Sequence, residues 1–325
     1  MAARSRDRHY GPAVPAGWEL TGRGGPRPFV SWVSYRLPDE TSYLWESRHQ
    51  RKGFGPRRVA ERQPKTKPPR SPWLRFWAPA RLGWWVAVVF IVGSLLFIAG
   101  AAGSLVPHLF GGEHPMSVYA ETCYFIGASL YAVSICGQLL ESLNADDRIG
   151  PDRRSQAPEK FRWFAFEPHR LEFMTPFVLL IGSLVFNFET VFALGSTVEV
   201  LPELWLWESS MLGSVLFLVS ACMQLAEAGH GYVRFRPRDL SWWVAVCFVL
   251  GSIGFIIGTL PGLEPPGFPT AEQGPGALTV KLGFLGGGIA FLVGSYLMLP
   301  ELFTQTRAEE YPETAKPRPS GERER

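Results

Sequence analysis

The sequence is poor in the residues that build disulfide frameworks and metal sites. It has only four cysteines in 325 residues. Each lies inside an apolar run, where a free thiol behaves as a small hydrophobic side chain. His108 and His114 share one loop, but no third ligand has suitable spacing. We therefore expect no disulfide framework and no metal site.

Signatures of nucleotide binding and catalysis are also missing. The glycine-rich stretches GRGG and GFLGGG lack the flanking strand, lysine and serine of a phosphate-binding loop. No nucleophile is paired with a base that could activate it. We expect no cofactor and no enzyme activity. The basic N-terminal part has no recognition helix and no zinc ligands, so we expect no nucleic-acid partner either.

Charged residues are scarce between positions 82 and 303, where long apolar runs dominate. A bilayer core about 30 Å thick requires about 20 apolar residues in a helix, because unpaired backbone groups are too costly in hydrocarbon. The sequence therefore predicts a multi-pass membrane protein. Six segments satisfy this length, with approximate bounds 82–105, 119–143, 173–194, 205–228, 240–260 and 278–303.

Lysine and arginine are almost absent from one side of these spans. Only Lys281 of the 32 basic residues falls outside the two termini and the loops after the second and fourth spans. Because positively charged loops resist translocation, both termini should be cytoplasmic and the loops after the first, third and fifth spans external. The expected location is the plasma (inner) membrane.

The spans repeat one another. WWVAVVFIVGSLLFIAG, from Trp84, and WWVAVCFVLGSIGFIIG, from Trp242, agree at 11 of 17 positions, and the third span carries the same Gly-Ser step. The even-numbered spans share a glycine and a terminal glutamate. Small residues let membrane helices approach closely, so we interpret the repeated residues as packing surfaces. The candidate helix-packing residues are Gly93, Ser94, Gly127, Gly182, Ser183, Gly213, Gly251, Ser252 and Gly287.

Each repeat is a hairpin of two helices that enters from the cytoplasm and returns to it. The expected fold is an all-α membrane protein with six transmembrane helices as three parallel helical-hairpin repeats. These repeats span residues 81–145, 169–231 and 238–303.

Two-helix units with a mid-helix Gly-Ser step and a tryptophan-rich start resemble the YrhK-like domain of bacterial integral membrane proteins. The resemblance covers residues 82 to 303 as three tandem copies, of which the last helix departs most from the pattern. It implies a membrane location and carries no established activity.

Polar residues at membrane depth are candidates for function. The repeated glutamates Glu141, Glu227 and Glu301 end the even-numbered spans. A carboxylate at a helix C-terminus requires a compensating cation, so we expect them to pair with the arginines that start the odd spans. Those arginines are Arg81, Arg170 and Arg238. The alternative is an ion or proton pathway through the glutamates.

Other polar candidates lie along the helices. Gln138 and Gln224, one turn deeper than the glutamates, are expected to join helices by hydrogen bonds. Asn187 and Glu189 lie near the external face, where a salt bridge to Lys281 is expected and a cation vestibule is the alternative.

The ends of the chain are basic. In residues 1–80, alternating apolar and polar positions predict a β-hairpin at about 29–48, followed by a disordered proline-rich linker. The cytoplasmic basic residues should contact anionic lipid headgroups. The tail, 304–325, is expected to be disordered. Association into a homo-oligomer is left open.

These patterns favour a non-catalytic membrane scaffold or sensor. Its repeated polar residues lie at helix ends, whereas transporters usually bind substrates near the membrane midplane. A small-solute or ion transporter or channel is the alternative.

Overall fold

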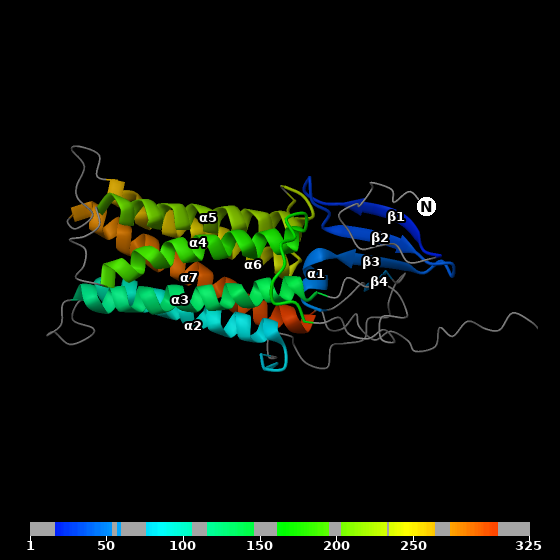
Figure 1. Cartoon of the computed structure of the whole chain (residues 1–325), viewed down its shortest axis with the longest axis horizontal. Coiled ribbons are helices and arrows are strands. Elements are labelled where there is room, and N and C mark those ends of the chain that lie inside the picture. Colours follow the sequence, from blue (N-terminus) through cyan, green and yellow to red (C-terminus); the bar gives the residue numbers. More distant parts are fainter. Residues whose placement is uncertain are drawn as a thin grey trace, which may run out of the picture.

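The computed structural model describes residues 17–53, 57–59, 76–105, 116–145, 161–194, 203–232, 234–263 and 274–304. They form a bundle of long helices with a small β-sheet at one end of the bundle (Figure 1). The expected disordered linker, the three external loops and nearly all of the C-terminal tail lie outside the described residues.

Six long helices form the bundle, and all six are long and apolar enough to cross a membrane. The predicted all-α membrane fold with six spans is thereby confirmed. The 3-10 helix Leu260–Leu263 continues the fifth span. The six helices are α2 (Leu82–Leu105), α3 (Met116–Leu143), α4 (Leu171–Leu194), α5 (Glu203–Gly229), α6 (Leu240–Thr259) and α7 (Gly274–Thr304).

The helices pack in chain order around a common axis. The most extensive contacts join α2 to α3, α4 to α5 and α6 to α7, which are the three hairpins. Further contacts join α3 to α4, α5 to α6 and α7 back to α2, so the hairpins close into a ring. Apolar side chains such as Val133, Leu184 and Leu250 are exposed on the outside of the helices. Such a continuous apolar exterior is typical of a surface that lipid covers.

A pair of glycines brings the two helices of each hairpin into backbone contact. A Cβ atom added to the glycine of the even-numbered span would lie only 2.9 to 3.0 Å from the carbonyl oxygen of the partner glycine. No larger residue fits at these positions without moving a helix. The pairs are Gly93 with Gly127, Gly182 with Gly213, and Gly251 with Gly287.

The serines beside these glycines are fully buried but differ in their hydrogen bonds. The hydroxyl of Ser94 lies 2.8 Å from that of Tyr131, which joins α2 to α3. Ser252 donates to the carbonyl oxygen of Phe248 in its own helix, at 2.8 Å. The Oγ of Ser183 has no hydrogen-bond partner among the described residues.

Aromatic rings fill the centre of the bundle, about one turn beyond each glycine. Neighbouring ring centroids are 5.1 to 6.3 Å apart, so the rings of all three hairpins form one connected group. Every ring is at most 3% exposed, so the group is dry. We call it the aromatic layer: Phe97, Tyr131, Phe186, Phe217, Phe255 and Phe291.

The sheet before the bundle has four antiparallel strands in chain order. They are β1 (Glu19–Gly24), β2 (Trp32–Arg36), β3 (Ser42–Glu46) and β4 (Arg57–Val59). Val33, Tyr35 and Trp45 form its buried core, against which Trp18 packs. The sheet region also contacts the bundle through polar bonds from Ser31 and Glu46 to His230.

The strands β2 and β3 pair within the hairpin expected at about 29–48, but the element is larger than that expectation. The strands β1 and β4 extend the sheet on both sides. The last two expected strand residues, Ser47 and Arg48, instead begin a short helix, α1 (Ser47–Arg51). This helix packs on α4 and α5, so it connects the sheet to the membrane helices (Figure 1).

Candidate functional site

The three repeated glutamates meet at the end of the bundle that α1 covers. Glu227 and Glu301 are fully buried there, and Glu141 is partly buried. The α1 segment supplies three cations whose side chains are less than a tenth exposed. We call these six residues the charge cluster: Glu141, Glu227, Glu301, Arg48, Arg51 and Lys52.

Glu301 has the closest cationic partners. Its carboxylate accepts hydrogen bonds from Nε and Nη2 of Arg48, at 2.9 and 3.4 Å. It also forms an ion pair with Nζ of Lys52 and accepts a hydrogen bond from Ser241. Burial lowers the pKa of Lys52 to about 8, although the adjacent Glu301 carboxylate acts to raise it. Both cations are therefore held in a desolvated site by one carboxylate.

The other two glutamates have weaker contacts with α1. Glu227 accepts a hydrogen bond of 2.9 Å from the hydroxyl of Ser47, and its second oxygen lies 3.9 Å from Nη2 of Arg51. Glu141 is influenced most strongly by Arg51 among the cations. Its carboxylate has room because residue 83 is glycine: a Cβ there would lie 2.7 Å from Oε1.

Local geometry holds α1 in this position. The backbone N–H of Ser47 donates to the carbonyl oxygen of Ser31, at 3.0 Å, which fixes the start of the helix against the sheet. Gly53 ends the segment with a φ of 79°, in the left-handed region that favours glycine. Its N–H donates to the carbonyl oxygen of Gln50 at 2.9 Å. The basic side chains between these points therefore face the bundle.

The predicted pairing of the glutamates with the arginines that start the odd spans is wrong. Arg81 donates to the backbone oxygen of Leu302, at 3.3 Å. Arg170 pairs with Glu167 and Glu172, at 2.7 and 2.8 Å. Arg238 is exposed and forms no hydrogen bond or ion pair with a described residue. The physical reason is that α1 covers the bundle axis, where the glutamates converge. These arginines instead lie just before the first residues of α2, α4 and α6.

The predicted role of the buried glutamines is also not seen. Gln138 and Gln224 are 4% and 3% exposed, and the Nε2 atom of each has no hydrogen-bond partner among the described residues. Serines make the bonds between helices instead. Ser134 donates to Val86 at 2.6 Å, and Ser220 donates to Thr175 at 2.8 Å.

Next to the aromatic layer, Asn187 joins two hairpins. Its Nδ2 donates to the carbonyl oxygen of Ala128 in α3, at 3.0 Å, and its Oδ1 accepts from Ser129 at 3.2 Å. Glu121 acts electrostatically on Glu189, so the two carboxylates are neighbours. The expected salt bridge to Lys281 is wrong, because Lys281 forms no ion pair within the described part of the chain.

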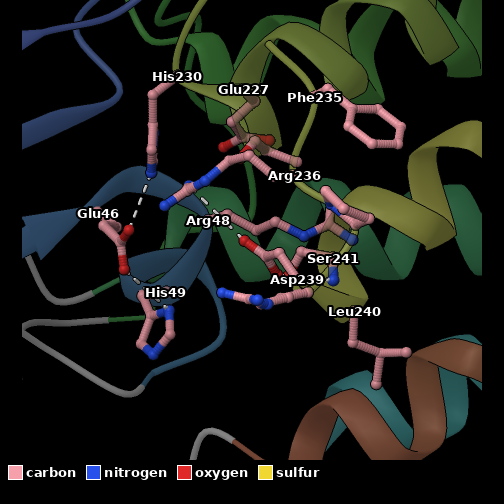
Figure 2. A pocket seen from close by; sticks show the side chains of 13 residues that line it. Glu46, Arg48, His49, Glu227, His230, Phe235, Arg236, Asp239, Leu240 and Ser241 are labelled. Carbon is pink, nitrogen blue, oxygen red and sulfur yellow. Dashed lines mark hydrogen bonds and ion pairs between the residues drawn. The ribbon is translucent and has the colours of Figure 1, made fainter.

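A cavity of about 730 Å³ lies beside the charge cluster, between α1 and the start of α6. Figure 2 shows Glu46 between His230 and His49 on one side of it, with Arg236 and Asp239 on the other. The Nε2 atom of His230 lies 2.9 Å from Glu46, and His230 Nδ1 lies 3.0 Å from the hydroxyl of Ser31. The cavity walls thus belong to both the sheet region and the bundle.

No group of three or more possible metal ligands occurs among the described residues. His108 and His114 lie outside that part of the chain. The cationic face of α1 was not identified from the sequence. The segment SRHQRK after a strand carries three basic residues within five positions, and their number equals that of the repeated glutamates. This equality of three basic residues and three glutamates is the feature of the sequence that could have indicated the pairing.

The sequence matches no known protein family, and comparisons with curated proteins and solved structures give no match. The resemblance to the YrhK-like domain stays a prediction.

Proposed function

We propose that the protein is a non-catalytic membrane scaffold or sensor whose N-terminal sheet is docked on the helix bundle by α1. The observation that carries this proposal is the insertion of three cations of α1 among one glutamate from each hairpin. Through this contact, a single soluble element is linked to all three repeats. A change in the packing of any hairpin would therefore alter the position of the sheet.

The charges in this contact are better suited to specifying a position than to adding stability. Burying six charged groups has a large desolvation cost, which close pairing offsets only in part. Apolar residues would hold two surfaces together more simply. A site in which three carboxylates match three cations selects one docked arrangement, and it weakens when any charge is neutralised. These properties fit a sensor that alternates between docked and released states.

The aromatic layer supports a scaffold or sensor over a transporter. Transporters usually bind their substrates near the midplane, where polar groups and interrupted helices form the site. The corresponding depth of this bundle holds six contacting aromatic rings. A solute or proton passing from the glutamates to the other end would have to displace them.

The proposed location is the plasma membrane, with both termini in the cytoplasm. The sheet and the end of α7 lie at the same end of the bundle (Figure 1). Among the described residues, the basic side chains other than Lys281 also lie toward that end, which supports cytoplasmic placement and contact with anionic headgroups. A YrhK-like relationship would agree with this arrangement.

The proposal is tested by measuring docking and transport in the same variants. Gln50 is fully buried and its side-chain atoms have no hydrogen-bond partner among the described residues, so Gln50→Cys is a suitable reporter of docking. In a background with the native cysteines replaced, a maleimide should label it slowly. The double variant Glu141→Gln, Glu227→Gln should label faster and, like the parent, show no flux in reconstituted vesicles.

Glu208→Gln is the matched control, because this exposed glutamate lies on the same helix as Glu227 but at its other end. It should leave the labelling rate unchanged. Solute-dependent or pH-dependent flux in the parent that disappears in the folded double variant would replace the scaffold with a transporter.

A further inference from the structure

The cavity beside the charge cluster has the size and position of a ligand site. Its volume of about 730 Å³ is within the usual range for small-molecule pockets. Its walls come from the end of β3 and α1, from the end of α5, and from the segment that leads into α6. A molecule bound there would touch the docked sheet region and the bundle together.

The acidic groups that face the cavity already have partners within the protein. Glu46 lies 2.9 Å from His230 and 3.6 Å from His49. Glu227 accepts from Ser47 through one oxygen, whereas its other oxygen, Oε2, has no hydrogen-bond partner among the described residues and lies 3.9 Å from Arg51. Asp239 accepts a hydrogen bond of 3.0 Å from the backbone N–H of Ser241, at the start of α6, and lies 3.7 Å from Arg236. Most of this negative charge therefore already faces a partner within the protein.

The basic groups keep hydrogen-bond donors available. Arg48 is 6% exposed and lines the cavity, and its Nη1, although buried, has no hydrogen-bond partner among the described residues. Arg238 also lines the cavity and forms no hydrogen bond or ion pair with a described residue. The contacts of Arg236 are long: its Nη1 lies 3.2 Å from the carbonyl oxygen of Ala228 and 3.7 Å from Asp239. Three guanidinium groups therefore surround one space.

Comparison of the three hairpins shows how the third one differs where the cavity lies. The prolines Pro79, Pro168 and Pro237 each stand three residues before the first residue of an odd span. Two residues after the first two prolines, the chain has the arginines that make the contacts described above. After Pro237 it has Asp239, and the arginine is one residue earlier, where it faces the cavity.

We propose that this cavity binds a phosphate-bearing ligand through Arg48, Arg236 and Arg238. Guanidinium groups match phosphate oxygens in geometry, and a phosphate can accept from several of them at once. The cavity borders Leu240, the first residue of a membrane span, so its depth corresponds to the headgroup region. The phosphate can belong to a lipid headgroup or to a free solute. This inference rests on the proposed function in one respect: α1 must be docked to form a wall.

The test compares two variants that remove the same charge from the same segment. Arg238→Gln alters the cavity, whereas Arg234→Gln alters an exposed arginine outside it. The probes for the full chain in detergent are glycerol 3-phosphate, with glycerol as its control, measured by titration calorimetry, and phosphatidylglycerol, measured by native mass spectrometry. Saturable binding of the first indicates a free solute, and binding of the second alone indicates a headgroup.

With either probe, Arg238→Gln should weaken binding on the order of tenfold or more, because one charge-assisted hydrogen bond is lost. Arg234→Gln should bind like the parent. Equal affinities in the two variants would overturn the assignment, as would absence of binding to a parent in which Gln50→Cys labels slowly. If that cysteine labels rapidly in the parent, α1 is not docked, and the proposed function fails together with this site.

Discussion

Replacing Glu301 by glutamine should release α1 from the bundle more than any other neutral substitution of a repeated glutamate. Glutamine keeps the shape of the side chain but removes the charge that faces Arg48 and Lys52. Loss of one partner from a buried ion pair costs about 3 to 5 kcal/mol. Glutamine can still accept from Arg48, so we expect a value near the lower end.

The contacts of the three glutamates predict an order of effects. Glu227→Gln keeps an acceptor for Ser47 but removes the charge from that hydrogen bond and from the longer contact with Arg51, so the loss should not exceed the value of about 1.5 to 3 kcal/mol for a hydrogen bond to a charged group. Glu141 has the longest-range interactions with α1 and should have the smallest effect. The expected order is therefore Glu301, then Glu227, then Glu141.

The labelling rate of Gln50→Cys measures this effect directly. If α1 opens and closes faster than the maleimide reacts, the rate is proportional to the released population. A destabilisation of about 3 kcal/mol then raises the rate about a hundredfold. Thermal unfolding in detergent gives the accompanying change in overall stability, and Glu208→Gln serves as the control.

Two results would refute this reasoning. One is a labelling rate in Glu301→Gln that does not exceed that of Glu208→Gln. The other is a larger effect from Glu141→Gln than from Glu301→Gln, which would mean that α1 docks in a different register. Arg48→Gln combined with Glu301→Gln should be less damaging than the sum of the single changes, because contacting charges are coupled.

Three further predictions concern packing, pH and orientation. Gly182→Leu should lower the melting temperature, because a Cβ at this position would already lie 2.8 Å from the Cβ of Leu216 in α5. The expected loss of stability is about 1 to 3 kcal/mol. The control Gly286→Leu should leave the melting temperature unchanged, because the space around Gly286 is open. Docking of α1 should tighten as pH rises from about 8 to 10. Burial lowers the pKa of Lys52 to about 8 in the docked state, so docking releases the Lys52 proton in this pH range. In Lys52→Met, the Gln50→Cys labelling should lose this dependence on pH. An impermeant maleimide on intact cells should label a cysteine at Gly112 and not one at Ser155, and the reverse would invert the orientation.

The bundle could be predicted from the sequence because its determinants are local and repeated. A helix that crosses a membrane needs about 20 apolar residues whatever its neighbours are. The Gly-Ser steps recur at equal depth, and small residues that recur in this way indicate a surface where helices meet. In the fold, Gly127 and Gly213 do lie against the backbone of the preceding helix.

The partners of the glutamates could not be predicted in this way, since they depend on contacts between distant parts of the chain. Glu301 and Arg48 are separated by 253 positions. The arginines that start the odd spans are much closer in sequence and lie at the same end of the bundle, so they are the natural expectation. Only the path of the chain after β3 decides which cations cover the axis, and that path is set by the backbone bond between Ser47 and Ser31 and by the turn at Gly53.

Differences among the three similar hairpins explain where function can arise. Each contributes one glutamate to the charge cluster and two rings to the aromatic layer, so these features follow the repeat. Beside the cavity the third hairpin departs from the repeat, because Asp239 stands where the other two hairpins have an arginine. Asp239 caps the start of α6 by accepting a hydrogen bond from the backbone N–H of Ser241, and the preceding residue, Arg238, lines the cavity. A departure from an otherwise regular repeat therefore creates the asymmetry that a ligand site requires.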